Sequence, residues 1–220
     1  MKVTELSIPG AWEFLPQRFT DDRGSFLAWY QAGPFAEALG YELTIAQVNQ
    51  SVSRRGVIRG VHWVDVPAGQ AKYVYCPRGA VLDVVVDLRV GSPTFGRYEV
   101  VRLDAVDHRA VYLSEGLGHA FVALEDDTIV SYLCSTGYDP ARERALHVYD
   151  EELGLRWPDG PEPVLSARDA AAPTLAELRA ADRLPRYDEC QRLHQAKRRA
   201  FQAQAQAQEH RADRDRSGGG

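Results

Sequence analysis

The sequence has few cysteines, no excess of basic residues and no long hydrophobic run. Its three cysteines lie far apart and form no C-x-x-C pair, which argues against a disulfide framework or a zinc site and favours reduced thiols in a cytoplasmic protein. No apolar stretch approaches the roughly 20 residues of a membrane span, and the start, MKVTELSIPGAWEF, lacks the apolar core of a signal peptide. The net charge of −5 argues against nucleic acid as the main partner.

What the sequence does contain is typical of a globular domain with an appendage. Hydrophobic residues make up 45% and charged residues 26% of the 220 positions, an ordinary composition for one sizeable core. β-rich runs at 72–103 and 110–135 are punctuated by PRG, GSPTFG and EDD, which predicts an antiparallel sandwich or barrel. The helical signals are GPFAEALGYEL at 33–43 and a region from Thr174 to Ala181, where Thr174 and Glu177 have capping-box spacing.

The character of the sequence changes at Arg186. Residues 186–220 combine a Gln/Ala repeat with mixed charge and offer little apolar face to bury. We therefore expect one domain over residues 1–185. The tail over residues 186–220 is expected to be a solvated polar helix that frays into a disordered end, without a catalytic role.

The decapeptide RRGVIRGVHW at 54–63 is the segment that looks least like plain scaffold. It is either an edge strand with a solvated face or the wall of a site for an anionic ligand. Perfect alternation directs Arg59 and His62 to opposite faces of the strand. Both can face one ligand only if the strand is bulged or bent, and Gly60 between them is the natural place for this.

Other residues with useful chemistry are isolated in the sequence. Lys72 opens an apolar run, Tyr132 lies in TIVSYLCS, and His119 follows a glycine-rich turn. Asp169 occupies the first turn of a short predicted helix that Ser166 caps. Taken alone, each of these is more often a structural residue than a functional one. Composition and periodicity predict a β-rich domain and no more.

The order in which these residues occur changes that interpretation, because the blocks around them match a known family. The matching blocks are FTDDRGSF (19–26), QVNQSVSRRGVIRGVHW (47–63), QAKYVYCPRGAVLDVVVDLRVGSPTFGRYE (70–99), LSEGLGHAFVAL (113–124), YLCSTGYDPARE (132–143), LGLRWP (153–158) and LSARDA (165–170). Over residues 1–180 the chain resembles the dTDP-4-dehydrorhamnose 3,5-epimerases and their deoxysugar relatives. The resemblance implies a mainly β fold, a cupin-type antiparallel β-barrel (jelly roll) with a few peripheral helices.

The resemblance also implies an isomerase reaction. The enzyme would invert C-3, C-5 or both in a dTDP-4-keto-6-deoxyhexose, in deoxysugar biosynthesis for a bacterial natural product. Both carbons flank the C-4 carbonyl, which acidifies both protons. A base, an acid on the opposite face and a cation at the developing oxyanion therefore suffice, without a redox cofactor.

The resemblance assigns a role to each matching residue. His62 is the base, Asp169 is hydrogen-bonded behind it, Tyr132 is the acid on the opposite face, and Lys72 lies beside the C-4 oxygen. A carboxylate behind the imidazole orients the ring and favours its charged form. The residues expected to bind the sugar and the diphosphate are Phe19, Arg23, Phe26, Gln47, Asn49, Arg59, His119, Tyr138 and Glu143.

Several positions depart from the family pattern. Val64 replaces a common glutamine two residues after His62, and Ala28 and Trp29 stand where an acidic residue usually follows RGSF. The common AHGF is GHAF here, and VYDE at 148–151 replaces a tryptophan and an asparagine. These changes keep the predicted acid–base set but alter the lining, so inversion at C-3 alone, at C-5 alone or at both stays open.

A metal-dependent cupin is disfavoured. Such a site needs a closely spaced histidine pair, a glutamate and a later histidine, whereas Trp63 and Val64 follow His62. We therefore predict no metal and no cofactor. Two other functions stay open: a metal-free cupin ketoisomerase that moves the keto group of a dTDP-sugar between C-3 and C-4, and a non-catalytic nucleotide-sugar-binding module.

The resemblance finally implies a homodimer. Members of the family exchange strands between barrels, and part of each pocket is lent by the partner. The segment VTELSIPGAWEF at 3–14 predicts a strand that precedes the barrel. An unpaired edge strand favours association between chains.

Overall fold

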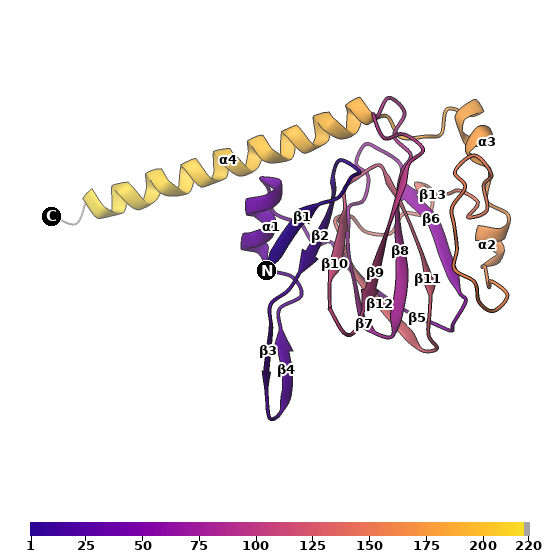
Figure 1. Cartoon of the computed structure of the whole chain (residues 1–220). Coiled ribbons are helices and arrows are strands. Elements are labelled where there is room, and N and C mark those ends of the chain that lie inside the picture. The colour runs from indigo at the N-terminus through magenta and orange to yellow at the C-terminus, as the bar shows by residue number, and fades with distance from the viewer. Residues whose placement is uncertain (218–220) are drawn as a thin grey trace.

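Two antiparallel sheets form the body of the protein (Figure 1), in a computed structural model that describes residues 1–217. The six-stranded sheet has the order β1 (Lys2–Glu5), β2 (Ala11–Leu15), β10 (Ala110–Leu113), β7 (Lys72–Arg78), β12 (Thr128–Cys134), β5 (Gln47–Ser53). The five-stranded sheet has the order β13 (Glu143–Ala145), β6 (Ile58–Val64), β11 (Leu117–Ala123), β8 (Ala80–Asp87), β9 (Tyr98–Asp104). The predicted antiparallel β fold is confirmed. Within the described residues, however, neither sheet closes into a barrel, because the end strands of each sheet pair on one side only.

The core lies between the inner faces of the two sheets. Val74 and Cys76 of β7 pack there with Val81 and Val85 of β8 and with Phe121 of β11. Side chains alternate between the two faces of a strand, so those named here all point from their own sheet into the space between the sheets. Each fully buried side chain of this size contributes about 1.5–3 kcal/mol, so this layer holds the two walls of the interior together.

The outer face of the six-stranded sheet is covered in part by α1 (Ala32–Leu39), the helix predicted at 33–43. Phe35 of α1 packs against Tyr73 and Tyr112, and the ring of Trp29 stacks on Tyr75 at a centroid distance of 4.8 Å. Strand β7 is therefore buried on both faces along YVYC. This explains why its sequence is a continuous apolar run rather than an alternating one.

The outer face of the five-stranded sheet is covered by the chain from residue 146 to residue 184, which includes α2 (Ala167–Ala170) and α3 (Leu175–Ala180). Leu146, Leu175 and Leu178 pack in one cluster with Trp63 of β6. The predicted capping box is confirmed, since Thr174 Oγ1 accepts a hydrogen bond from the backbone N–H of residue 177 and Thr174 N donates to the Glu177 carboxylate.

A hairpin of β3 (Arg18–Asp21) and β4 (Gly24–Leu27) extends away from the two sheets (Figure 1). Its two phenylalanines are exposed, Phe19 by 56% and Phe26 by 72%. Large apolar side chains that gather on a projecting hairpin are typical of a contact surface.

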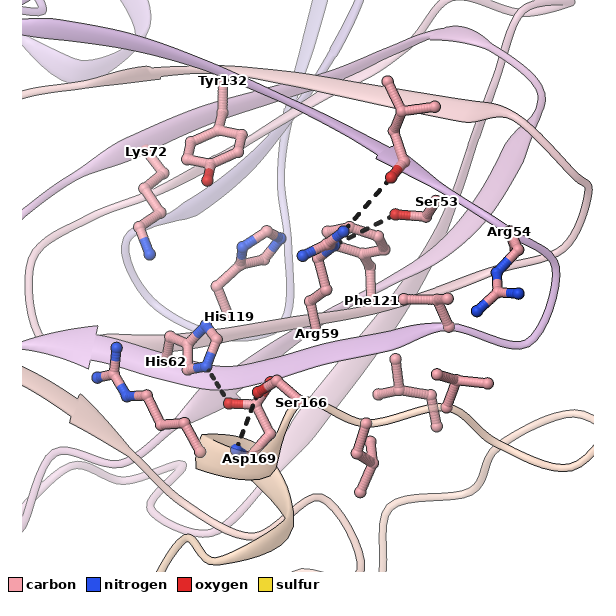
Figure 2. Close-up of a pocket in the computed structure, with 16 residues that line it drawn as sticks. Ser53, Arg54, Arg59, His62, Lys72, His119, Phe121, Tyr132, Ser166 and Asp169 are labelled. Atoms are coloured by element: carbon pink, nitrogen blue, oxygen red, sulfur yellow. Dashed lines mark hydrogen bonds and ion pairs between the residues drawn. The ribbon is translucent and has the colours of Figure 1, made fainter.

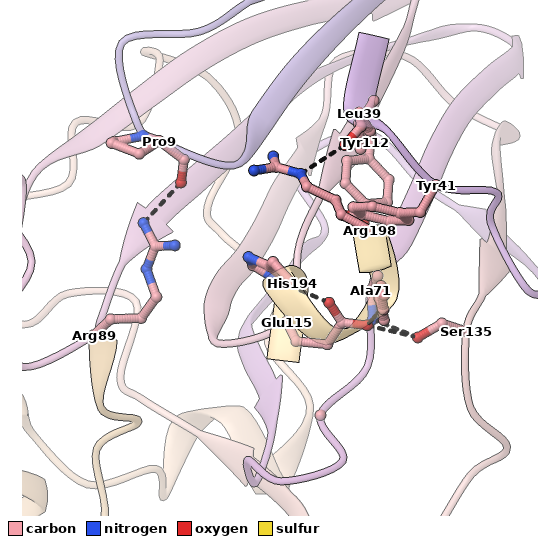
Figure 3. Close-up of polar contacts among 12 residues, drawn as sticks. Pro9, Leu39, Tyr41, Ala71, Arg89, Tyr112, Glu115, Ser135, His194 and Arg198 are labelled. Carbon is pink, nitrogen blue, oxygen red and sulfur yellow. Dashed lines mark hydrogen bonds and ion pairs between the residues drawn. The ribbon is translucent and has the colours of Figure 1, made fainter. Parts of the chain in front are cut away.

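The C-terminal helix α4 (Tyr187–Ser217) begins against the body and then runs past it (Figure 1). Cys190 and His194 in its first turns are buried. Figure 3 shows that His194 Nε2 donates to the buried Glu115 carboxylate at 3.1 Å and Arg198 Nε donates to the Leu39 carbonyl at 2.9 Å. The tail predicted over residues 186–220 thus includes a packed segment, and its last three residues lie outside the described residues.

Among residues 1–217, no helix combines the length and the apolar character that a bilayer crossing requires.

Candidate active site

One cavity of about 520 Å³ is lined by both sheets and by the segment that leads into α2 (Figure 2). Its lining includes all four residues predicted to be catalytic, His62, Lys72, Tyr132 and Asp169. A volume of this size is within the range of small-molecule sites. The structure thus places together residues that are up to 107 positions apart in the chain.

Strand β6 carries a bulge that turns two of its side chains into this cavity. The register pairs His119 of β11 with His62 and Phe121 with Arg59, so two residues of β6 oppose one residue of β11. Gly60 at the bulge has φ +125°, and a Cβ there would lie 2.5 Å from the Cβ of Ala120. Only glycine fits this close approach. The bulge expected at this glycine is therefore confirmed, and Arg59 and His62 both line the cavity.

His62 is paired with the carboxylate at the start of α2. Its Nε2 lies 2.6 Å from Oδ1 of Asp169, whose backbone N–H is in turn capped by Ser166 Oγ at 3.1 Å. Burial opposes the charge on Asp169, but the hydrogen bond from His62 and the cap outweigh it and hold the pKa of this carboxyl below its usual value. An ionised carboxylate accepts only. Asp169 therefore fixes the proton on Nε2 and leaves the lone pair of Nδ1 for a ligand.

Tyr132 approaches the cavity from the opposite wall. It lies on β12 of the six-stranded sheet, whereas His62 lies on β6 of the five-stranded sheet, and Figure 2 shows the two side chains entering from opposite sides. Burial, reinforced by the nearby thiol of Cys134, raises the pKa of the Tyr132 phenol. The phenol is thus protonated at neutral pH and is suited to donate a proton.

Lys72, at the start of β7, is buried beside Tyr132 on the wall formed by the six-stranded sheet. Burial lowers the pKa of its ammonium, and the acidic groups of Cys134, Glu143 and Asp83 oppose that shift. A charge this deep in the interior interacts strongly with any negative charge that forms in the cavity, because little water screens it. The position suits the stabilisation of an oxyanion.

Two of the nine residues predicted to bind substrate, Arg59 and His119, line the cavity. Arg59 Nε donates to Ser53 Oγ at 3.2 Å, which holds its guanidinium over β5. His119 Nε2 lies 2.6 Å from Oδ2 of Asp83. The side chains of both residues are thereby oriented before any ligand arrives.

The other seven residues predicted to bind substrate do not line this cavity. Gln47 and Asn49 are joined by a 2.6 Å hydrogen bond on β5, and Gln47 Oε1 accepts from the backbone N–H of Tyr138 at 2.8 Å. Glu143 pairs with β6 through β13. The remaining three, on the projecting hairpin, are Phe19, Arg23 and Phe26, and the Arg23 side chain is 90% exposed.

Sequence reasoning missed several lining residues. Arg54 and Arg168 face the cavity, and Asp83 lies behind His119. The signal for Asp83 was present, since an aspartate interrupts the apolar run AVLDVVV of β8. Arg168 adjoins Asp169 in LSARDA, and Arg54 belongs to the decapeptide already singled out.

Comparison with known proteins identifies similar chains. A family model described as dTDP-4-dehydrorhamnose 3,5-epimerase matches residues 5–177. A relative from Streptomyces niveus, named dTDP-4-dehydrorhamnose 3-epimerase, is 57% identical over 191 residues, which are 87% of this chain and 92% of the relative.

Solved structures agree with this match. The RmlC epimerase of Mycobacterium tuberculosis superposes with a TM-score of 0.88 at 49% identity, over 90% of this chain and 100% of that one. ChmJ, a 3′-monoepimerase from Streptomyces bikiniensis solved in complex with dTDP-quinovose, superposes with a TM-score of 0.86. It is 51% identical, over 88% of this chain and 98% of that one.

Proposed function

The chain belongs to the dTDP-4-dehydrorhamnose 3,5-epimerase family, and from this premise we propose how its site works. The enzyme is an isomerase that inverts C-3, C-5 or both in a dTDP-4-keto-6-deoxyhexose during deoxysugar biosynthesis. The observation that carries the mechanism is the placement of His62 and Tyr132 on opposite walls of one cavity, with Lys72 buried beside them.

His62 removes the proton. The lone pair of Nδ1 takes a proton from the carbon next to the C-4 carbonyl, and the electron pair of the broken C–H bond moves onto the C-4 oxygen. The ring becomes an imidazolium, which Asp169 stabilises through the 2.6 Å contact at Nε2. The Lys72 ammonium stabilises the enolate oxygen.

Tyr132 completes the inversion by donating its phenolic proton to the opposite face of the same carbon. The enolate electrons then return to form the new C–H bond and restore the ketone. The tyrosinate and the imidazolium return to their starting states through solvent. The step needs no electron acceptor, because the substrate and the product have the same oxidation state.

The nucleotide end of the substrate is bound by arginines. Arg59 and Arg54 line the cavity on the side of β5 and β6. A planar guanidinium pairs with two oxygens at once, which suits a diphosphate. We assign the dTDP diphosphate to this side, and the reacting sugar to the side of His62 and Lys72.

We also infer a homodimer in which the β3–β4 hairpin completes the partner's pocket. Phe19, Arg23 and Phe26 point into solvent and lie outside their own cavity. On the outer face of the edge strand β5, Val48 and Val52 are exposed by 62% and 57%. An apolar edge and a projecting aromatic hairpin together fit a second copy of this chain.

Complementation tests this arrangement. Arg23→Ala and His62→Asn homodimers should both be inactive. In an equal mixture that exchanges subunits, about half of the dimers are mixed, and each mixed dimer contains one intact site out of two. The mixture should therefore recover about a quarter of the wild-type rate. The recovery requires that hairpin and pocket come from different subunits. An inactive mixture, or sedimentation of the active enzyme at monomer mass, would refute it.

The described residues include three unpaired thiols, Cys76, Cys134 and Cys190, all buried. Free thiols are typical of a reducing compartment. We therefore propose that the enzyme acts in the cytoplasm.

Deuterium exchange tests the proposed function. In D₂O, the enzyme should introduce deuterium at C-3 or C-5 of a dTDP-4-keto-6-deoxyhexose and invert that carbon, as followed by NMR. His62→Asn, which fills a similar space, should bind dTDP but exchange no deuterium. A 3-keto product would instead indicate a ketoisomerase, and binding without exchange by the wild-type protein would indicate a binding module.

A further inference from the structure

The backbone just before Lys72 is held by a serine at the end of the neighbouring strand. Ser135 directly follows β12, and its backbone N–H donates to the Ala71 carbonyl at 3.0 Å. Its Oγ accepts a hydrogen bond from the backbone N–H of Ala71 at 2.8 Å. Both polar backbone groups of the fully buried Ala71 are therefore bound to one residue. Ala71 immediately precedes Lys72, the first residue of β7.

The hydroxyl of Ser135 is bound in turn by a buried carboxylate. Because Oγ accepts from Ala71, its hydrogen is left to donate, and Oε1 of Glu115 lies 3.4 Å away (Figure 3). The same Oε1 accepts from Lys197 Nζ, and Oε2 accepts from His194 Nε2 at 3.1 Å. A line of polar contacts thus runs from α4 through the interior to Ala71.

The turn that leads into Ala71 packs on the same residues. Gly69 has φ +69°, and a Cβ there would lie 2.6 Å from the Cβ of Glu115. Thr136 Oγ1 donates to the Gly69 carbonyl at 3.0 Å, and the Thr136 carbonyl accepts from Gln70 Nε2 at 2.9 Å. Residues 69–71 are consequently fixed on one side by Glu115 and on the other by residues 135 and 136.

These contacts lie outside the cavity but end at a residue that lines it. Glu115, Ser135 and Ala71 do not belong to the lining, whereas Lys72 does. The backbone at the end of a strand is where local opening is easiest. A displacement of about 1 Å in a group that acts on the reacting atoms can cost about a hundredfold in rate. The end of β7 is therefore the place where the position of the ammonium needs support.

We propose that Ser135 and Glu115 are positioning residues for the epimerisation. They hold residues 69–71 so that the Lys72 ammonium stays beside the C-4 oxygen of the sugar, and the first turns of α4 hold Glu115. This rests on the proposed function. Neither residue touches the substrate, and both act through the backbone that carries Lys72.

The first test removes one hydroxyl. Ser135→Ala should lose about tenfold or more in kcat with the sugar substrate, and it should bind dTDP, which lacks the sugar, with the wild-type Kd. Ser135→Thr keeps the hydroxyl and should keep a kcat close to that of the wild type. A wild-type kcat in Ser135→Ala, or equal losses of kcat and dTDP binding, overturns the proposal.

The matched control is Ser92→Ala. Ser92 Oγ donates to the buried carboxylate of Asp87 at 2.5 Å, and neither residue lines the cavity. This change removes the same group from the same kind of contact. It should lower the melting temperature and leave kcat as it is. A loss of kcat equal to that of Ser135→Ala would show a general loosening of the fold and overturns the proposal.

The second test observes the lysine without turnover. The sequence contains three lysines, Lys2, Lys72 and Lys197, so the NMR signals of protein labelled with ¹³C at lysine Cε are assigned by single Lys→Arg changes. Ser135→Ala should move the Lys72 signal, and Ser92→Ala should not. An unmoved signal in Ser135→Ala overturns the proposal. A wild-type protein that fails to exchange deuterium refutes the proposed function instead, while the Lys72 signal still decides the role of Ser135.

The third test concerns α4. Lys197→Met removes the ammonium from Glu115, whereas Arg198→Met removes a charge that anchors the same helix at the Leu39 carbonyl, a 2.9 Å contact that does not involve Glu115. Both changes should lower the melting temperature. Only Lys197→Met should also move the Lys72 signal and lower kcat. Equal effects of the two changes on kcat and on the signal overturn the role assigned to α4.

Discussion

Replacing Glu115 by Gln should cost the protein about 3 kcal/mol at neutral pH. Glu115 lies between β10 and β11 and is 1% exposed. It accepts a hydrogen bond from His194 of α4 (Figure 3) and a second one from Lys197 of the same helix. Burial raises the pKa of this carboxyl, but the contacts with His194 and Lys197 outweigh it and lower the pKa from 4.5 to about 2. A depression of about 2.5 units at 1.36 kcal/mol per unit corresponds to roughly 3 kcal/mol.

The pH dependence follows from the sign of the shift. A carboxyl whose pKa is lowered by folding contributes its full stability above its unfolded pKa, near 4.5, and loses it as the pH falls towards 2. The difference in unfolding free energy between wild type and Glu115→Gln should therefore be largest at pH 7 and shrink below pH 4.5. Urea unfolding at a series of pH values, followed by circular dichroism, measures this difference.

The control for this measurement is Glu152→Gln. Glu152 pairs with Arg179 at the surface, where both side chains are 47% exposed, and such pairs contribute about 1 kcal/mol or less. The reasoning is refuted if Glu115→Gln loses no more stability than the control, or if its loss is the same at pH 7 and pH 3.

Further predictions concern the site. Tyr132→Phe should exchange deuterium with little inversion, at a rate lower by about 10²–10⁴; inversion at the parent rate would show that another group is the acid. Asp169→Asn should give an intermediate loss of kcat, because the base stays but loses the charge that orients it, and a wild-type rate would contradict that role. Gly60→Ala should lower the unfolding free energy by about 2 kcal/mol or more in urea titration, because φ is positive and the added Cβ meets Ala120; a neutral change would mean that the bulge is not required. Excess chelator should leave the rate unchanged, whereas a loss restored by one metal would reveal a metal-dependent reaction.

Local patterns were sufficient for much of the fold. Capping spacing located α3 at Thr174, and the steric problem at Arg59 and His62 led to the bulge at Gly60. Both depend on a few neighbouring residues, so a single sequence carries the information. The pairing of strands into two sheets depends on contacts between distant residues, and composition alone could not order them.

The site was predictable only where the family resemblance named its residues. The charge of Asp83 is visible in the apolar run of β8, but a single sequence gives no indication of the histidine that it contacts 36 positions away. The burial of His194 was missed for a similar reason. The helix has little apolar surface of its own, and the residue is buried because Glu115 offers a partner. In both cases the decisive contact is tertiary and polar, and periodicity does not record it.

The placement of His62 and Tyr132 on different sheets has a consequence for how this enzyme can evolve. The position of one group relative to the other is set by side chains packed between the sheets, and not by hydrogen bonds between the backbones of paired strands. Packed sheets lie about 10 Å apart, a gap that core substitutions adjust by fractions of an ångström. Substitutions in that layer therefore shift the base relative to the acid by small steps, while both reacting groups stay the same.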